Sequence, residues 1–136
     1  MKYKYKVLIV DEDENILYDI KKLLEQETYV VETTQSAMEA FEKVKKDKYH
    51  IVLVDTDFHE MNGIELLKEI KRYDALTQVI MMSGHSTMEK ILNSLEYGAN
   101  DYILKPFRSM DHVIGVIDYS VQKLERWRKS IIEIVK

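Results

Sequence analysis

Short apolar runs alternate with amphipathic stretches along the whole chain. Five segments have the β-branched and apolar composition of short buried strands: residues 7–10, 29–33, 51–55, 78–82 and 101–104. After each one, apolar residues recur at helical spacing, in stretches that begin near Glu14, Ser36, Gly63, Thr87 and Ser109. Strands that alternate with helices in this way are typical of a parallel sheet with helices on both faces. The pattern therefore predicts a single α/β domain.

Local signals predict several helix boundaries and one buried face. Ser36 followed by Glu39 is a capping-box pattern at the start of the second helix. Gly98 predicts a left-handed residue after the fourth helix. In the third helix we expect the inward-facing side chains to be Ile64, Leu67 and Ile70.

Size and composition exclude several classes of protein. The 136 residues fit one domain, and the 46% hydrophobic content is enough for one core. The 32% charged content and the net charge of −4 favour an ordinary soluble surface over direct nucleic-acid binding. The absence of cysteine excludes disulfides, thiol catalysis and cysteine-ligated zinc. No apolar run reaches the roughly 20 residues of a membrane span, so we expect a cytoplasmic protein without membrane contact.

Charged and hydroxyl side chains follow four of the predicted strands. They are Asp11 and Glu12 after the first strand, Asp55 at the end of the third, Ser83 after the fourth and Lys105 after the fifth. Carboxyl ends of parallel strands meet at one edge of the sheet, where such folds bind ligands. If the first and third strands are neighbours, three carboxylates converge there, which requires a cation or shared protons.

The residue types in this group suit phosphoryl chemistry. Carboxylate oxygens favour Mg²⁺, which binds one or two protein carboxylates together with water and phosphate oxygens. The ammonium group of Lys105 and the hydroxyl of Ser83 would contact further phosphoryl oxygens. Asp55 is the candidate nucleophile, since an aspartate can accept phosphate covalently when a metal offsets the repulsion between the two anions.

The order of these motifs resembles the receiver domain of two-component response regulators, over residues 4 to about 120. The resemblance lies in Val10-Asp11-Glu12, Val54-Asp55, Met61-Asn62-Gly63, Met82-Ser83-Gly84-His85, Gly98-Ala99-Asn100-Asp101-Tyr102 and Lys105-Pro106-Phe107. It implies a flavodoxin-like, doubly wound α/β fold, with a five-stranded parallel sheet of order 2-1-3-4-5 and five helices. It also implies that residues 1–120 form the receiver domain.

The resemblance assigns a role to each candidate site residue. Asp55 corresponds to the phosphoacceptor. Asp11 and Glu12 correspond to the acidic pair that holds Mg²⁺, together with Asp55 and the backbone carbonyl of Asp57. Lys105 corresponds to the lysine that pairs with the phosphoryl group.

Two further positions correspond to the receiver switch. Ser83 matches the hydroxyl that moves toward the phosphoryl group, and Tyr102 matches the aromatic residue that fills the vacated space. The face of the fourth helix, fifth strand and fifth helix would change as a result. The implied partner is a sensor histidine kinase or a phosphotransfer protein, and the chain would catalyse only its own phosphoryl transfer and dephosphorylation.

Two other functions remain open at the level of the sequence. Asp55-Thr56-Asp57 after a buried strand is similar to the nucleophile and acid/base pair of haloacid-dehalogenase-type phosphatases. However, His59 stands where that family has a hydroxyl, and the chain has no room for a cap domain. The third possibility is a receiver-like interaction module that no longer depends on phosphate.

The last predicted helix continues beyond the length that a receiver requires. Its apolar positions alternate in spacings of four and three: Val113, Ile117, Ser120, Leu124, Trp127, Ile131 and Ile134. We expect the first half to pack on the sheet and residues 121–136 to form an extension with exposed apolar side chains. This pattern predicts a partner helix, either from a second copy, giving a homodimer, or from a downstream domain. We interpret the cations between Lys123 and Lys129 as a solvated helix face.

Overall fold

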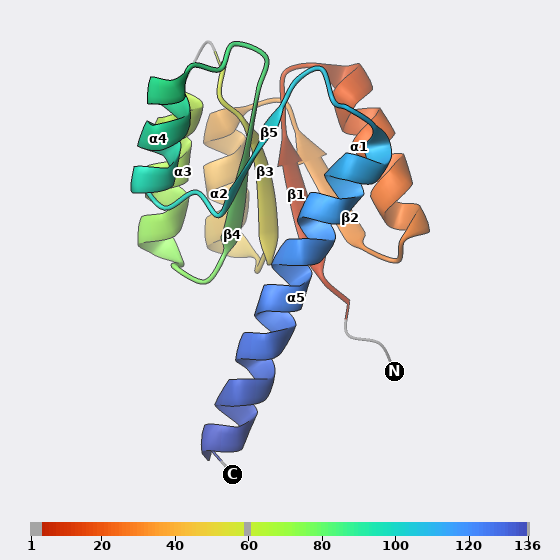
Figure 1. Ribbon diagram of the computed structural model, residues 1–136, viewed down its shortest axis with the longest axis vertical. Coiled ribbons are helices and arrows are strands. Elements are labelled where there is room, and N and C mark those ends of the chain that lie inside the picture. Colours follow the sequence, from red (N-terminus) through yellow and green to blue (C-terminus); the bar gives the residue numbers. More distant parts are fainter. Residues whose placement is uncertain (1–3, 59–60, 136) are drawn as a thin grey trace.

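The computed structural model describes residues 4–58 and 61–135, in which the predicted strands and helices alternate (Figure 1). The strands are β1 (Lys6–Val10), β2 (Val30–Thr34), β3 (Ile51–Asp55), β4 (Gln78–Ser83) and β5 (Asp101–Leu104). The helices are α1 (Glu14–Gln26), α2 (Ala37–Lys46), α3 (Gly63–Tyr73), α4 (Met88–Glu96) and α5 (Met110–Val135). His59 lies outside the described residues.

The strands form one parallel sheet in the order β2-β1-β3-β4-β5, which confirms the predicted topology. Helices α1 and α5 cover one face, and α2 and α3 cover the other (Figure 1). Helix α4 follows β4, and the ammonium group of Lys68 in α3 lies 4.0 Å from the ring of Tyr97 at the end of α4. Because all the strands run parallel, their carboxyl ends lie at one edge of the sheet.

The alternation of side chains along each strand builds two hydrophobic cores. On one face, Leu8, Val52 and Val79 pack with the buried sides of α2 and α3. On the other face, Val7, Ile51 and Ile80 pack with α1 and α5. The central strands β1, β3 and β4 are buried on both sides, which explains why their sequences are apolar without alternation.

Most helix boundaries match the predictions, with two differences of detail. Ser36 Oγ accepts from the backbone N–H of Glu39 at 3.1 Å, but the N–H of Ser36 donates to Thr34 Oγ1, so no reciprocal capping box forms. Gly98 has a positive φ of 100°, as predicted. In α3, Ile64 is only partly buried and Leu66 is fully buried. The buried face is rotated because α3 packs against both α2 and the sheet.

Helix α5 lies across the sheet and then projects past its amino edge (Figure 1). Val113, Ile117 and Ser120 are its buried residues. Its middle is tied to the sheet because the hydroxyl of Tyr29 donates to Asp118 at 2.5 Å, and that of Tyr5 donates to Glu125. None of the helices in the described residues combines the length and the apolar character that crossing a bilayer requires.

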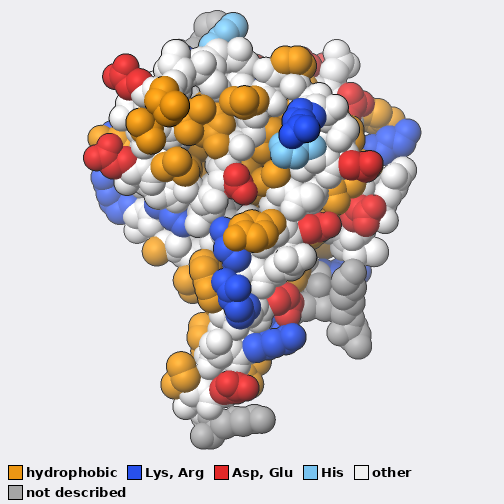
Figure 2. Space-filling view, viewed as in Figure 1, with side chains coloured by type: hydrophobic (Ala, Val, Ile, Leu, Met, Phe, Trp, Pro, Cys, Tyr) orange, Lys and Arg blue, Asp and Glu red, His pale blue; other side chains and the backbone are white. Residues whose placement is uncertain are grey.

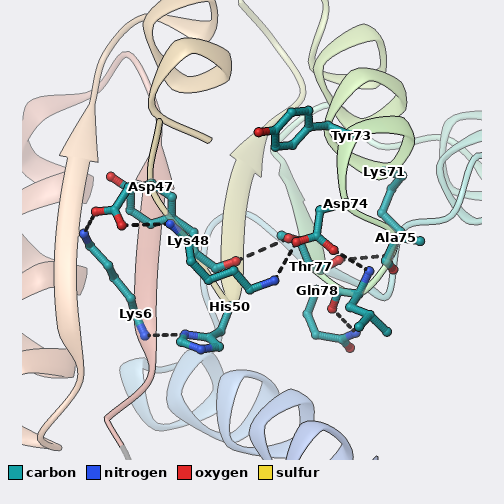
Figure 3. A network of polar contacts seen from close by, with 12 residues as sticks. Lys6, Asp47, Lys48, His50, Lys71, Tyr73, Asp74, Ala75, Thr77 and Gln78 are labelled. Atoms are coloured by element: carbon teal, nitrogen blue, oxygen red, sulfur yellow. Dashed lines mark hydrogen bonds and ion pairs between the residues drawn. The ribbon is translucent and has the colours of Figure 1, made fainter. Parts of the chain in front are cut away.

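A network of polar contacts joins the amino ends of the central strands, opposite the predicted site (Figure 3). The backbone N–H of Lys6 donates to His50 Nδ1 at 3.0 Å, and Lys48 Nζ donates to Asp74 at 2.6 Å. Burial lowers the pKa of His50, and the charge of Lys48 adds to this effect, while Asp74 opposes it. The fold therefore favours the neutral imidazole.

Gly63 lies directly against the backbone at the end of β3. A Cβ atom at this position would lie 2.5 Å from the carbonyl oxygen of Asp55 and 2.6 Å from the Cα of Thr56. Neither backbone atom can move away as a flexible side chain could. Only glycine allows α3 to start this close to the strand.

We expect Gly63→Ala to lower the free energy of unfolding by about 1–3 kcal/mol, because the added methyl group forces the backbone apart. Gly115→Ala is the matched control: it lies in α5, and nothing lies within 4 Å of its added Cβ. That variant should gain roughly 0.5–1 kcal/mol from reduced chain entropy. Urea unfolding of both variants measures the difference, and equal effects would contradict the close contact at Gly63.

We expect the stability of the protein to fall as the pH drops below the ordinary His50 pKa of 6.5. Below this pH the unfolded chain binds a proton at His50 more readily than the folded chain does. The stability that the neutral imidazole contributes is therefore fully present above this pH and is lost below it. His50→Gln keeps an acceptor for the N–H of Lys6 and should flatten this part of the curve. Thermal unfolding of both chains at several pH values tests this, and parallel curves would contradict it.

Candidate functional site

The carboxyl edge of the sheet brings together a lysine and two carboxylates from three different strand ends. Lys105 Nζ lies 2.6 Å from Asp11 Oδ2 and 3.4 Å from Asp55 Oδ1. Asp11 follows β1, Asp55 ends β3, and Lys105 follows β5. The sheet order makes β1 and β3 neighbours, so the predicted convergence of these three residues is present.

Both carboxylates are buried, and this governs their electrostatics. Asp11 is 1% exposed and Asp55 is 7% exposed. Burial raises the pKa of Asp55, and the neighbouring Asp11 raises it further, while Lys105 and the backbone N–H of Asp57 act in the opposite direction. Two anions are thus held close together, with one ammonium group to offset their repulsion.

Ser83 lies beside this cluster at the end of β4. Its hydroxyl donates to Asp57 Oδ2 at 3.5 Å and accepts from the backbone N–H of His85 at 3.1 Å. The backbone N–H of Lys105 donates to the carbonyl of Ser83 at 2.8 Å, which fixes the separation of the two strand ends. The Lys105-Pro106 peptide bond is cis.

Glu12 lies apart from the two buried carboxylates. Its side chain is exposed and lines a groove of about 960 Å³ between α1 and the β2–α2 connection. The described residues contain no group of three histidine, cysteine, aspartate or glutamate side chains placed to hold a metal ion. The third carboxylate near Asp11 and Asp55 is that of Asp57, whose charge also raises the pKa of Asp55, whereas Glu12 is exposed.

Tyr102 lies on β5 beside the β4–α4 loop. Its ring is partly buried against the core that contains α2 and α3, and its hydroxyl oxygen accepts from Ser86 Oγ at 3.2 Å. Ser86 comes three residues after Ser83 in the same loop. Tyr102 and Ser83 are thus connected through one short segment.

The structure adds two features that the sequence analysis did not predict. Thr56 is buried directly after Asp55, and its Oγ1 has no hydrogen-bond partner among the described residues. The side chain of Asp57 contacts Ser83, whereas the receiver resemblance assigned Asp57 a role through its backbone carbonyl. No sequence signal distinguishes a side chain that turns inward in a loop from one that points to solvent.

Comparison with protein families gives a match over most of the chain. A profile of the response regulator receiver domain matches residues 7–117. The nisin biosynthesis regulatory protein NisR of Lactococcus lactis is 32% identical over 127 residues, covering 93% of this chain and 55% of the relative. The cell cycle response regulator CtrA of Brucella ovis is 30% identical over 127 residues, covering 93% of this chain and 54% of the relative. The chain thus spans about half the length of these relatives.

Solved structures agree with this match. A CheY-like response regulator receiver domain from Methanospirillum hungatei has a TM-score of 0.88 at 31% identity, covering 91% of this chain and 98% of that one. The beryllofluoride-activated DrrB receiver domain has a TM-score of 0.81 at 27% identity, covering 88% and 99%. The motifs, the strand order and these similarities lead to one conclusion: the chain belongs to the receiver domains of two-component response regulators.

Proposed function

We propose that this receiver works in the cytoplasm as a phosphorylation-controlled switch, with Asp55 as the acceptor of the phosphoryl group. The donor is a phosphohistidine of a sensor histidine kinase or a phosphotransfer protein. One observation carries the proposal: Lys105 Nζ lies between the buried carboxylates of Asp11 and Asp55 at the ligand-binding edge of the sheet.

In the transfer step, a carboxylate oxygen of Asp55 attacks the phosphorus atom. The bond between phosphorus and the donor's imidazole nitrogen breaks, and its electron pair stays on that nitrogen, which then takes up a proton. Lys105 would bind an oxygen of the transferred group and offset its charge. The chain catalyses only this transfer and the later hydrolysis of its own acyl phosphate.

The donor set at this edge fits Mg²⁺. Asp11 and Asp55 present two buried carboxylates, and Mg²⁺ commonly binds one or two carboxylates and keeps several water molecules. The backbone carbonyl of Asp57 and the exposed Glu12 would complete the set. When bound, the ion offsets the charge repulsion between Asp55 and the incoming phosphoryl group.

The contacts of Ser83 and Tyr102 support a switch in the β4–α4 loop. To meet a phosphoryl group on Asp55, the hydroxyl of Ser83 must leave Asp57, from which it is 3.5 Å away. A shift of this loop also alters the contact between Ser86 and Tyr102. Phosphorylation would in this way change the position of Tyr102.

The face next to this loop is loosely held and apolar, as a switching surface requires. Of the nine residues of α4, only Ser94 is buried. Figure 2 shows apolar side chains gathered over this part of the molecule, and exposed ones there are Met88, Leu92, Leu95 and Leu104. We assign the output of the switch to this α4–β5–α5 face.

The extension at residues 121–136 is a second contact element in this proposal. Trp127, Ile131 and Ile134 are 36%, 53% and 81% exposed. Large apolar side chains exposed next to one another typically mark a surface that contacts another molecule. The receiver domain then comprises residues 1–120, and the extension binds a second helix.

We expect the protein to gain one phosphoryl group when it is incubated with Mg²⁺ and acetyl phosphate, as measured by intact-protein mass spectrometry. Asp55→Ala should gain none, whereas Asp111→Ala, which removes an exposed carboxylate on α5, should label like the wild type. Lys105→Met should slow the labelling roughly 10-fold or more. A wild-type chain that stays unlabelled would favour the module that does not use phosphate.

We expect Asp55→Asn to be more stable than the wild type in metal-free buffer at neutral pH. The fold raises the pKa of Asp55, so the ionised carboxylate destabilises the folded state, and a neutral amide of equal size removes that penalty. The melting temperature should rise by a few degrees, for roughly 1 kcal/mol. Mg²⁺ should stabilise the wild type and leave this variant unchanged.

The control for this prediction is Asp19→Asn, which neutralises an exposed carboxylate on α1. Its melting temperature should stay within the range of ordinary surface substitutions, about ±0.5 kcal/mol. A lower melting temperature for Asp55→Asn would show that the ion pair with Lys105 outweighs the burial of the charge.

A further inference from the structure

One apolar seam runs along the whole of α5, and the domain covers only its first half. Val113, Ile117 and Ser120 are fully buried against the sheet. The same seam continues through Leu124 and then Trp127, Ile131 and Ile134, whose exposure rises from 36% to 53% and 81%. Leu124, Trp127 and Ile131 line a groove together with Leu76, so this apolar face of the projecting half lies on the same side of α5 as the domain.

This placement argues against a parallel pair of helices that is in contact along the whole of α5. In a parallel pair, residues 110–120 of the second helix would run beside residues 110–120 of the first, on its seam side. That space is occupied by the sheet, against which Val113 and Ile117 are 0% exposed. Each domain would collide with the other helix. An antiparallel helix approaches from below the domain and meets only the projecting half.

The spacing of the exposed seam fits its own reverse copy. The positions 124, 127, 131 and 134 are separated by three, four and three residues, which reads the same in both directions. In an antiparallel pair, Leu124 faces Ile134 of the second copy, and Trp127 faces Ile131. Such a two-fold, self-complementary contact is the usual form of a dimer interface.

The charges beside the seam favour the same orientation. In a parallel pair, Lys123 and Arg128 occupy the flanking positions that face each other across the interface, so two like-charge pairs result. In the antiparallel register, flanking positions of the same kind lie together, so Lys123 lies near Ser130 of the second copy and the two copies of Arg128 lie beside each other. One like-charge pair then replaces two.

A groove at the base of the domain would receive the end of the second helix. It has a volume of about 350 Å³ and is lined mainly by apolar side chains, among them Leu76, Leu124, Trp127 and Ile131. Leu76, at the amino edge of the sheet, is 56% exposed. In the antiparallel register, Ile134 of the second copy lies level with Leu124, at this groove.

We infer that the chain forms an antiparallel dimer through residues 124–135, with the seam of each α5 packed on that of a second copy. The inference deepens the proposed contact role of residues 121–136 and is independent of phosphorylation at Asp55. The two domains then lie at opposite ends of the paired helices. Each groove at the amino edge is filled by the partner's Ile134.

Disulfide trapping tests the orientation, because the wild-type chain contains no cysteine. Leu124→Cys and Ile134→Cys should cross-link with each other when the two variants are mixed and oxidised, and neither should cross-link alone. In the antiparallel register, the two copies of residue 134 lie about 15 Å apart along the helix axis, beyond the reach of a disulfide. Strong cross-linking of Ile134→Cys with itself would overturn the orientation.

Light scattering after size-exclusion chromatography tests the dimer itself. The wild type should show twice the chain mass of 16.1 kDa, with a concentration-dependent loss of the dimer on dilution. Ile131→Glu should be monomeric with an unchanged circular dichroism spectrum, since this residue is exposed. Gln122→Glu, an exposed position on the opposite side of α5, places the same charge away from the seam and should remain dimeric.

Two outcomes would overturn the proposal. One is a wild-type chain that stays monomeric at high concentration. The other is a monomer that sediments with vesicles containing anionic phospholipid, which would assign the apolar face and its cations to a membrane surface. All measurements use protein without Mg²⁺ or a phosphoryl donor, and Asp55→Ala should leave the cross-linking of the two cysteine variants unchanged when it is added to both. Failure here therefore leaves the phosphoacceptor role of Asp55 untouched.

Discussion

The geometry of the carboxyl edge depends on the sharing of one ammonium group by two buried carboxylates. Asp11 and Asp55 lie at the ends of adjacent strands, where their charges repel, and Lys105 contacts both. This arrangement requires strands β1, β3 and β5 to end at the same height. The parallel registers of the sheet and the backbone bond between Lys105 and Ser83 provide that alignment. The phosphoryl chemistry proposed for this edge thus depends on the topology of the whole domain.

The ion pairs that stabilise the fold and the site of the proposed chemistry lie at opposite edges of the sheet. The carboxyl edge holds a buried charge cluster that is strained electrostatically, as the raised pKa of Asp55 indicates. At the amino edge, charged side chains form ion pairs, such as Lys48 with Asp74 and Lys6 with Asp47. Proteins commonly tolerate unfavourable charge at a functional site when the rest of the fold supplies the stability.

Much of the fold and the site was predictable from the sequence, for identifiable physical reasons. Buried strands such as residues 51–55 are apolar on both faces, and the charged or hydroxyl residues at the ends of four strands mark the ligand edge. Asp11, Asp55, Ser83 and Lys105 were located in this way. The exposure of Glu12 and the contact of the Asp57 side chain with Ser83 were not predictable. They depend on loop conformations that leave no periodic signal in the chain.

Helix α5 starts five residues after Lys105 and ends beyond the opposite edge of the sheet. Its 26 residues form one uninterrupted rod of roughly 39 Å. The rod is tied to the sheet near its middle by Asp118 and Glu125, so that region acts as a fulcrum. The far tip lies roughly 20 Å from this region, so a tilt of α5 by about 5° would move the tip by about 2 Å. A change at the carboxyl edge that tilts α5 would therefore also move the end of the helix beyond the amino edge.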